Sequence, residues 1–132
     1  LAGKTIDAKS LRGKVTLVEF WAEWCPPCRS TLAWLAETHR KLGDSVNVLG
    51  IAVESEEANI RAIAKTMSLP YPIAMGSPQV ALLFGDIVSV PTLFVFDRAG
   101  KTANVFYGAP PDLHEQVSRA MAEAMTRSDA RG

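Results

Sequence analysis

The feature that most constrains the fold is an abrupt change of pattern within residues 15–29, VTLVEFWAEWCPPCR. Residues 15–20 form a near-continuous apolar run, which is typical of a strand in a sheet covered on both faces. From the second cysteine onward, residues that would share one face of a helix recur at steps of three and four: Cys28, Leu32, Leu35, His39 and Leu42. Gly43 then ends the helix, and residues 46–53 are a second apolar run. We therefore predict a βαβ unit with parallel strands and a right-handed crossover.

The rest of the chain completes an α/β domain. We predict a helix capped by Ser55, an edge strand within residues 69–75, and a short helix over 77–85. Strands over 92–96 and 101–107 should form an antiparallel hairpin, and a last helix should follow. The predicted fold is a single domain over 1–132, with a central mixed β-sheet and helices on both faces.

Composition excludes several classes of protein. Lys plus Arg and Asp plus Glu number 14 each, so no charge excess favours nucleic acid or an anionic membrane. The longest apolar run, 88–96, is interrupted by Ser89 and Pro91 and is too short to span a bilayer. The chain begins with Leu1 rather than Met, so we expect a signal or membrane anchor to have been removed before it.

The two cysteines, Cys25 and Cys28, are separated only by Pro26 and Pro27. A disulfide between them would close almost no loop and would stabilise the fold little. Cys25 is predicted to lie at a helix N-terminus, where backbone N–H groups and the helix dipole stabilise a thiolate. A more buried Cys28 would then resolve the mixed disulfide that Cys25 forms with a substrate. Zinc binding and two inert core cysteines are the alternatives, but a zinc site needs about four ligands.

The prolines indicate the direction of the reaction. Pro26 and Pro27 fit the first two helical positions, and neither has an N–H or a positive charge to offer a Cys25 thiolate. A strong disulfide oxidant is one whose reduced form is specially stabilised. The motif therefore favours a reductant.

Glu19 is an acid inside the first predicted strand. If it is buried, its pKa should be raised, and it could take the proton that Cys28 must lose before it attacks. Alternatively, Glu19 lies at a solvated edge of the sheet, or pairs with Lys14 or Arg40.

Two segments, VEFWAEWCPPCR and VSVPTLFVFDRAGK, resemble the two signatures of the thioredoxin-like superfamily. The resemblance places Glu19 at the family's acid position, six residues before the first cysteine. It implies that Pro91 is a cis-proline beside the dithiol, and that the backbone of Val90 pairs with an extended substrate peptide. Trp24 would belong to the exposed rim that meets partners.

The 38 residues from Val53 to Pro91 leave room for an extra strand and helix, an insertion at about 54–88 before the cis-proline. With the opening LRGKVTLVEFWA, this resembles the TlpA-like branch (ResA/CcmG type), whose members are mostly bacterial periplasmic reductases. That branch usually has Asn where Glu19 stands and Glu where Thr31 stands. Apocytochrome c is therefore not carried over as the substrate.

The sequence thus predicts a thiol-disulfide oxidoreductase that mainly reduces protein disulfides, with no cofactor and no metal. Cys25, Cys28 and Glu19 would be catalytic; the residues expected to bind substrate are Trp24, Pro26, Pro27, Val90 and Pro91. We expect a monomer that takes electrons from a donor dithiol protein such as a membrane reductase, in the bacterial periplasm or on the extracytoplasmic face of the membrane, with the cytoplasm as the alternative.

Three other functions stay open: a disulfide oxidase, an isomerase, and a copper- or zinc-binding metallochaperone. A peroxidase is disfavoured because Ala22, rather than Thr or Ser, stands three residues before Cys25.

Overall fold

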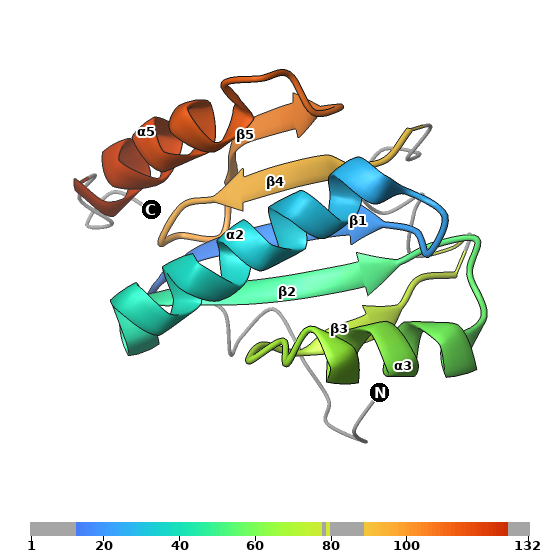
Figure 1. Cartoon of the computed structure of the whole chain (residues 1–132). Coiled ribbons are helices and arrows are strands. Elements are labelled where there is room, and N and C mark those ends of the chain that lie inside the picture. Colours follow the sequence, from blue (N-terminus) through green and yellow to red (C-terminus); the bar gives the residue numbers. More distant parts are fainter. Residues whose placement is uncertain (1–12, 78, 80–88, 127–132) are drawn as a thin grey trace.

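The computed structural model describes residues 13–77, 79 and 89–126 of the chain. Within them, a five-stranded mixed sheet packs against three α-helices (Figure 1). The strands are β1 (Val15–Trp21), β2 (Val46–Ala52), β3 (Ile73–Met75), β4 (Thr92–Phe96) and β5 (Thr102–Tyr107). The helices are α2 (Pro26–Leu42), a 3₁₀ turn η1 (Gly43–Ser45), α3 (Glu57–Thr66) and α5 (Leu113–Thr126).

The strand order is β3-β2-β1-β4-β5, so the strand that precedes the cysteines is the central one. β2 pairs in parallel with β1 and β3, whereas β4 is antiparallel to both β1 and β5. The predicted βαβ unit, edge strand and antiparallel hairpin are therefore confirmed. The chain therefore has the predicted α/β fold with a central mixed sheet.

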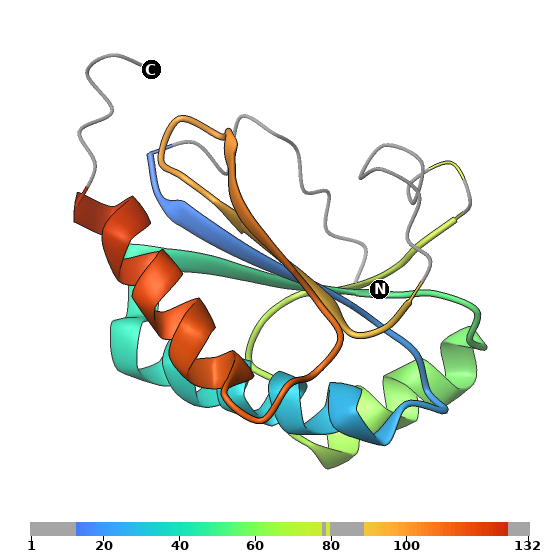
Figure 2. The ribbon, with the colours of Figure 1, turned by 90° about the horizontal axis from the view of Figure 1, so that it is seen from above.

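The periodicity of β1 divides the core into two layers. Val15, Leu17 and Trp21 belong to the larger buried cluster, which also holds the inner faces of all three helices. Val18 and Phe20 point to the opposite face and form a second cluster with Ile51 and Phe94. Helices were predicted on both faces, but Figure 2 shows α2, α3 and α5, the helices of the described residues, together on the first face of the sheet. The short helix predicted over 77–85 falls, apart from two residues, outside the described part of the chain.

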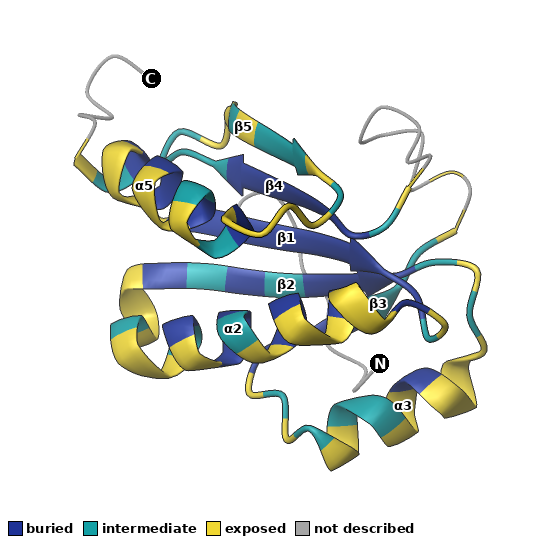
Figure 3. Cartoon of the chain, turned by 45° about the horizontal axis from the view of Figure 1, so that its top comes forward, coloured by how far each residue is buried: buried dark blue, intermediate teal, exposed yellow. Residues whose placement is uncertain are grey.

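The helix faces follow the predicted apolar positions. Cys28, Leu32 and Leu35 are buried on α2. Figure 3 shows buried and exposed residues alternating along this helix. On α3 the fully buried side chain is Ile60, and Ile63, Ala64 and Met67 pack around it. β1 is buried along its whole length. A polar side chain on β1 is therefore enclosed by protein on every side.

One predicted detail is wrong. Ser55 does not cap α3; the N-cap residue is Glu56, which forms no side-chain cap bond of its own. Ser55 Oγ instead donates to Val53 O at 2.9 Å and accepts from Glu23 N at 2.9 Å. Ser55 therefore links the loop before α3 to the loop before α2.

Candidate active site

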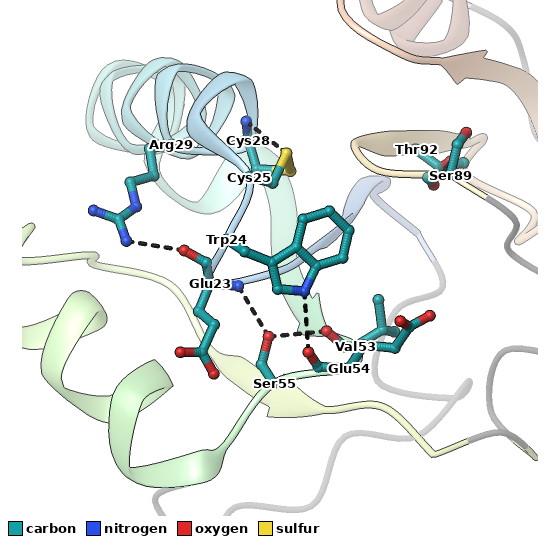
Figure 4. Close-up of a disulfide and its surroundings, with 10 residues drawn as sticks. All are labelled: Glu23, Trp24, Cys25, Cys28, Arg29, Val53, Glu54, Ser55, Ser89 and Thr92. Atoms are coloured by element: carbon teal, nitrogen blue, oxygen red, sulfur yellow. Dashed lines mark hydrogen bonds between the residues drawn. A yellow bond between two sulfur atoms is a disulfide. The ribbon is translucent and has the colours of Figure 1, made fainter.

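The two cysteines lie where β1 gives way to α2. Cys25 is the N-cap of α2, and Pro26 and Pro27 fill the first two helical positions. Cys25 and Cys28 form a disulfide with 5.3 Å between their Cα atoms (Figure 4). The backbone N–H of Cys28 also points at the other sulfur, with 3.3 Å between Cys28 N and Cys25 Sγ. The predicted position of the pair at a helix entrance is confirmed.

The two sulfurs differ in access. Cys25 keeps 5% of its surface exposed and Cys28 keeps 0%. Trp24, the neighbour of Cys25, is 59% exposed. An approaching disulfide therefore meets Cys25 first, beside a large aromatic surface, while Cys28 stays beneath it.

Hydrogen bonds from the next loop hold the cysteine loop in place. Trp24 Nε1 donates to Glu54 O at 3.2 Å, next to the Glu23–Ser55 bond already described (Figure 4). The Glu23 carboxylate accepts from the backbone N–H of Glu56 at 2.8 Å and from Asn59 Nδ2 at 2.7 Å. Glu23 therefore caps α3 from a distant part of the chain.

Sequence reasoning missed this role of Glu23. The only local signal was an acid directly before Trp24 in the cysteine loop. A second polar contact, from Arg29 Nη2 to Glu23 O at 3.0 Å, closes the loop on α2.

Glu19 lies at the centre of β1, opposite Gly50 on β2 and Leu93 on β4. Its side chain is 0% exposed, and neither carboxyl oxygen has a hydrogen-bond partner in the described structure. Burial raises the pKa of Glu19 well above its ordinary value, because the charged form loses its hydration. The alternatives of a solvated edge and of a pair with Lys14 or Arg40 are therefore wrong. Arg40 instead pairs with Glu37.

Glu19 shares its environment with Cys28. Its same-face neighbours on β1, Leu17 and Trp21, belong to the buried cluster that contains Cys28. An acid with a raised pKa thus lies on the face of the sheet that α2 covers, beside the cluster that contains Cys28. A buried carboxyl group is the kind of group that can exchange a proton with a thiol.

Tyr71 is a second buried titratable group, and the sequence analysis did not identify it. Its hydroxyl donates to Leu32 O at 2.9 Å and so ties the segment before β3 to α2. Burial, and after it the negative charge of Glu19, raise the pKa of Tyr71. Tyr71 is therefore an electrostatic neighbour of Glu19.

Pro91 follows a cis peptide bond from Val90, as the resemblance implied. It directly precedes β4, whose first residue, Thr92, pairs with Phe20 near the end of β1. Thr92 Oγ1 donates to Ser89 O at 2.7 Å and fixes the turn. Figures 1 and 2 both place the start of β4 at the end of the sheet where α2 begins. The cis-proline and the cysteines therefore share one edge of the molecule.

A shallow hollow adjoins this edge. Its walls come from the first turns of α2 and from the chain leading into α5: Pro27, Ser30, Thr31, Ala109, Pro110, Pro111, Leu113 and His114. The described residues hold no group of three or more His, Cys, Asp or Glu that could bind a metal ion. None of the described helices is both long and apolar enough to cross a bilayer.

Comparison with known proteins agrees with this geometry. The model of the AhpC/TSA family matches residues 1–105. A thiol:disulfide interchange protein of the thioredoxin family from Chlorobium tepidum is 31% identical, with a TM-score of 0.83 over 93% of this chain and 88% of that one. A secreted disulfide oxidoreductase of Mycobacterium tuberculosis, 20% identical, shares the fold with a TM-score of 0.75 over 89% of this chain and 87% of that one.

Two curated relatives carry names of the same kind. The thioredoxin-like protein YneN of Bacillus subtilis is 27% identical over 82% of this chain. The thiol-disulfide oxidoreductase ResA of Bacillus cereus is also 27% identical over 82% of the chain. The aligned part spans 65% of YneN and 63% of ResA, slightly less than two thirds of each relative. Its homologues include thiol-disulfide oxidoreductases, and its own C-x-x-C pair is Cys25 and Cys28. The chain belongs to the AhpC/TSA family of thioredoxin-like proteins.

Proposed function

We propose that this domain reduces protein disulfides through its Cys-Pro-Pro-Cys dithiol. The observation that supports this best is the arrangement of the two sulfurs at the start of α2. Cys25 is the N-cap beside the exposed Trp24, and Cys28 lies one turn further on with no exposed surface. This is the asymmetry that a two-step exchange needs.

In the first step, the Cys25 thiolate attacks one sulfur of a substrate disulfide. A Cys25–substrate disulfide forms, and the other substrate sulfur leaves as a thiolate. In the second step, Glu19 accepts the proton of Cys28, and the Cys28 thiolate attacks Cys25 Sγ. The substrate leaves with both sulfurs reduced, and two electrons have passed from the Cys25–Cys28 pair, which ends as a disulfide.

The direction of the reaction rests on how few of the described groups stabilise the Cys25 thiolate. One backbone donor, the N–H of Cys28, points at Cys25 Sγ. Pro26 and Pro27 have no N–H and no charge, and Arg29, the basic residue in the first turn of α2, donates from Nη2 to Glu23 O at 3.0 Å. Since a weakly stabilised thiolate is readily oxidised, the dithiol favours giving electrons to the substrate.

We assign the substrate groove to the rim around Cys25. Trp24 supplies an exposed aromatic surface, and the exposed rings of Pro26 and Pro27 supply apolar contact beside the sulfur. The backbone of Val90, before cis-Pro91, would pair with an extended peptide by strand addition. A donor dithiol protein, such as a membrane reductase, would use the same rim to return electrons to the Cys25–Cys28 disulfide.

The proposal extends to the whole chain and its location. We treat 1–132 as one thioredoxin-like domain with an insertion at about 54–88, which contains α3 and β3. The secreted M. tuberculosis protein with the same fold supports a place of action outside the cytoplasm.

An insulin-reduction assay tests the activity. With dithiothreitol as electron source, the unmodified domain should reduce insulin, whose separated chains then precipitate. Cys25→Ser should lower the rate of precipitation to background. Activity that survives Cys25→Ser would refute the proposal. Cys28→Ser should instead retain substrates as mixed disulfides, which a non-reducing gel would detect.

The equilibrium potential of the dithiol tests the direction. A potential of about −270 mV is typical of a reductant, whereas a potential of about −120 mV is typical of an oxidant. Titration against glutathione, followed by the fluorescence of the three tryptophans, would give it.

A further inference from the structure

Three buried polar atoms on β1 lack a hydrogen-bond partner in the described structure: Glu19 Oε1, Glu19 Oε2 and Trp21 Nε1. Both side chains have no exposed surface. Residues two apart on a strand point to the same face, so these groups lie on the α2 side of the sheet. Two unpaired acceptors and one unpaired donor therefore lie on neighbouring positions of one strand.

Gly50 is the direct partner of Glu19 on β2, and Trp21 Nε1 lies close to it. A Cβ atom at Gly50 would lie 2.8 Å from Ile73 Cδ1, 3.2 Å from Trp21 Nε1 and 3.6 Å from Tyr71 Cε1. The indole N–H and the phenol ring thus stand over the bare backbone directly opposite Glu19. Because Gly50 has no side chain, β2 offers Glu19 neither a cation nor a side-chain donor at this position.

The other elements around Glu19 supply few polar groups. From β4 the opposite residue is Leu93, and from α2 the titratable residue in the same cluster is Cys28. Tyr71 comes from the segment before β3, but its hydroxyl proton is engaged by Leu32 O. The His39 ring lies behind it, 6.2 Å from the Tyr71 ring. Among the described residues, Trp21 therefore holds the uncommitted donor.

We propose that the indole N–H of Trp21 is the hydrogen-bond donor that holds the Glu19 carboxylate whenever this acid is ionised. Trp21 would then be a positioning residue for the proton exchange between Glu19 and Cys28, and to that extent the inference rests on the function proposed above. The proton passes from Cys28 Sγ to a Glu19 oxygen, leaving a thiolate and a neutral acid. The indole proton stays on Nε1 throughout and only gains or loses its acceptor.

The test is a pH titration of the reduced, full chain by NMR, with ¹⁵N-labelled tryptophan and ¹³C-labelled glutamate. The Nε1–H signal of Trp21 should move with the same midpoint as the Glu19 carboxyl signal, and Glu19→Gln should abolish that movement. Trp24 is an internal comparison, because its Nε1 donates to the backbone of Glu54 and should not follow Glu19.

The outcomes separate the inference from the proposed function. If Glu19 titrates with a raised midpoint while the Trp21 signal stays constant, the inference is wrong and the proton exchange survives. If Glu19 stays protonated at every pH at which the chain is folded, both are wrong. These readouts use the unmodified chain, so they do not depend on any variant that removes the large buried Trp21 side chain.

Trp21→Phe adds a second measurement where that variant folds. Removing the donor should raise the midpoint of Glu19 by about one further unit, a tenfold weaker acid. The pH at which the Cys28 step reaches half its full rate should rise by the same amount. Tyr71→Phe is the matched control. It removes a buried polar atom from the same cluster, but that atom already has a hydrogen-bond partner, Leu32 O. Equal shifts from the two variants would contradict a specific role for Trp21.

Discussion

The loop that presents Cys25 and the core position that holds Glu19 treat their polar groups in opposite ways. In the loop, Glu23 and Trp24 place their polar atoms on partners in residues 53–59. At the core position, both oxygens of Glu19 and the nitrogen of Trp21 are buried without a hydrogen-bond partner among the described residues. Paired groups hold a geometry, whereas an unpaired buried acid costs stability and has a shifted pKa. The comparison indicates that the loop holds a fixed geometry, whereas the core position holds an acid with a raised pKa, which is what the proposed proton exchange requires.

The largest effect should come from replacing the buried acid with an apolar side chain. Glu19→Leu removes two unpaired buried oxygens, so the free energy of unfolding of the oxidised chain should rise by about 1–3 kcal/mol. The same change removes the proton acceptor for Cys28, so release of the mixed disulfide should slow by about 100-fold. Urea denaturation and single-turnover kinetics measure the two effects. A loss of stability would mean that Glu19 makes bonds in solution that the structure lacks.

Stability should also depend on pH through Glu19, and the sign can be derived. The folded chain keeps the Glu19 proton at pH values where the unfolded chain, with a pKa near the ordinary 4.5, has released it. The free energy of unfolding should therefore fall as pH rises above 4.5, by up to about 1.4 kcal/mol per unit, and level off above the raised pKa. Oxidised protein is the right sample, because its cysteines do not titrate. This fall of stability with rising pH should vanish in Glu19→Gln; a fall that persists would belong to another group.

A smaller effect is expected at the loop. Glu23→Ala removes the acceptor for the backbone N–H of Glu56 and for Asn59, which together cap α3. Loss of such a cap should cost about 1 kcal/mol, seen as a lower urea midpoint. Glu57→Ala is the matched control, since it removes an exposed acid paired with Arg61 on the same helix. That pair is worth only about 0.2–0.5 kcal/mol, so equal losses in the two variants would contradict the capping role.

The smallest effect should come from His114 and should have the opposite sign to that of Glu19. Its ring stacks on Trp34 with 4.8 Å between centroids, and burial lowers its pKa. The unfolded chain then binds a proton more readily near pH 6.5, so acidification through that range should destabilise the folded chain slightly. His114→Phe keeps the stacking and removes the charge. The difference in melting temperature between His114→Phe and the unmodified chain should grow in favour of the variant as pH falls from 7 to 5.5. A constant difference would show that His114 protonation does not affect stability.

Much of the molecule could be predicted from the sequence because its signals are local. The apolar run of β1, the helical spacing of α2 and the two prolines after Cys25 each depend on neighbouring residues. Burial was one of the interpretations left open for Glu19, and its place within a near-continuous apolar strand favoured it. These local patterns and the tertiary structure agree, so the strand, the helix and the dithiol were all placed correctly.

The errors and omissions arise where partners are far apart in the chain. Ser55 was assigned the cap of α3 because capping was assumed to be local, but the acceptor is Glu23, 33 residues before Glu56. Tyr71 and Gly50 were missed because their relation to Glu19 depends on strand register and on how the segment before β3 folds back. No periodicity in one sequence specifies such a register.

The hydrogen bonds from Glu23 and Trp24 to the residues before α3 limit how this scaffold can be re-engineered. Trimming the chain toward a minimal domain by deleting residues 54–75, which include α3 and β3, would remove Ser55 Oγ and the carbonyl of Glu54, the two acceptors for hydrogen bonds from the cysteine loop. Such a shortened domain would keep both cysteines but lose the hydrogen bonds that hold the cysteine loop in position. Any chimera should therefore exchange residues 22–24 and 53–59 together, as a single module.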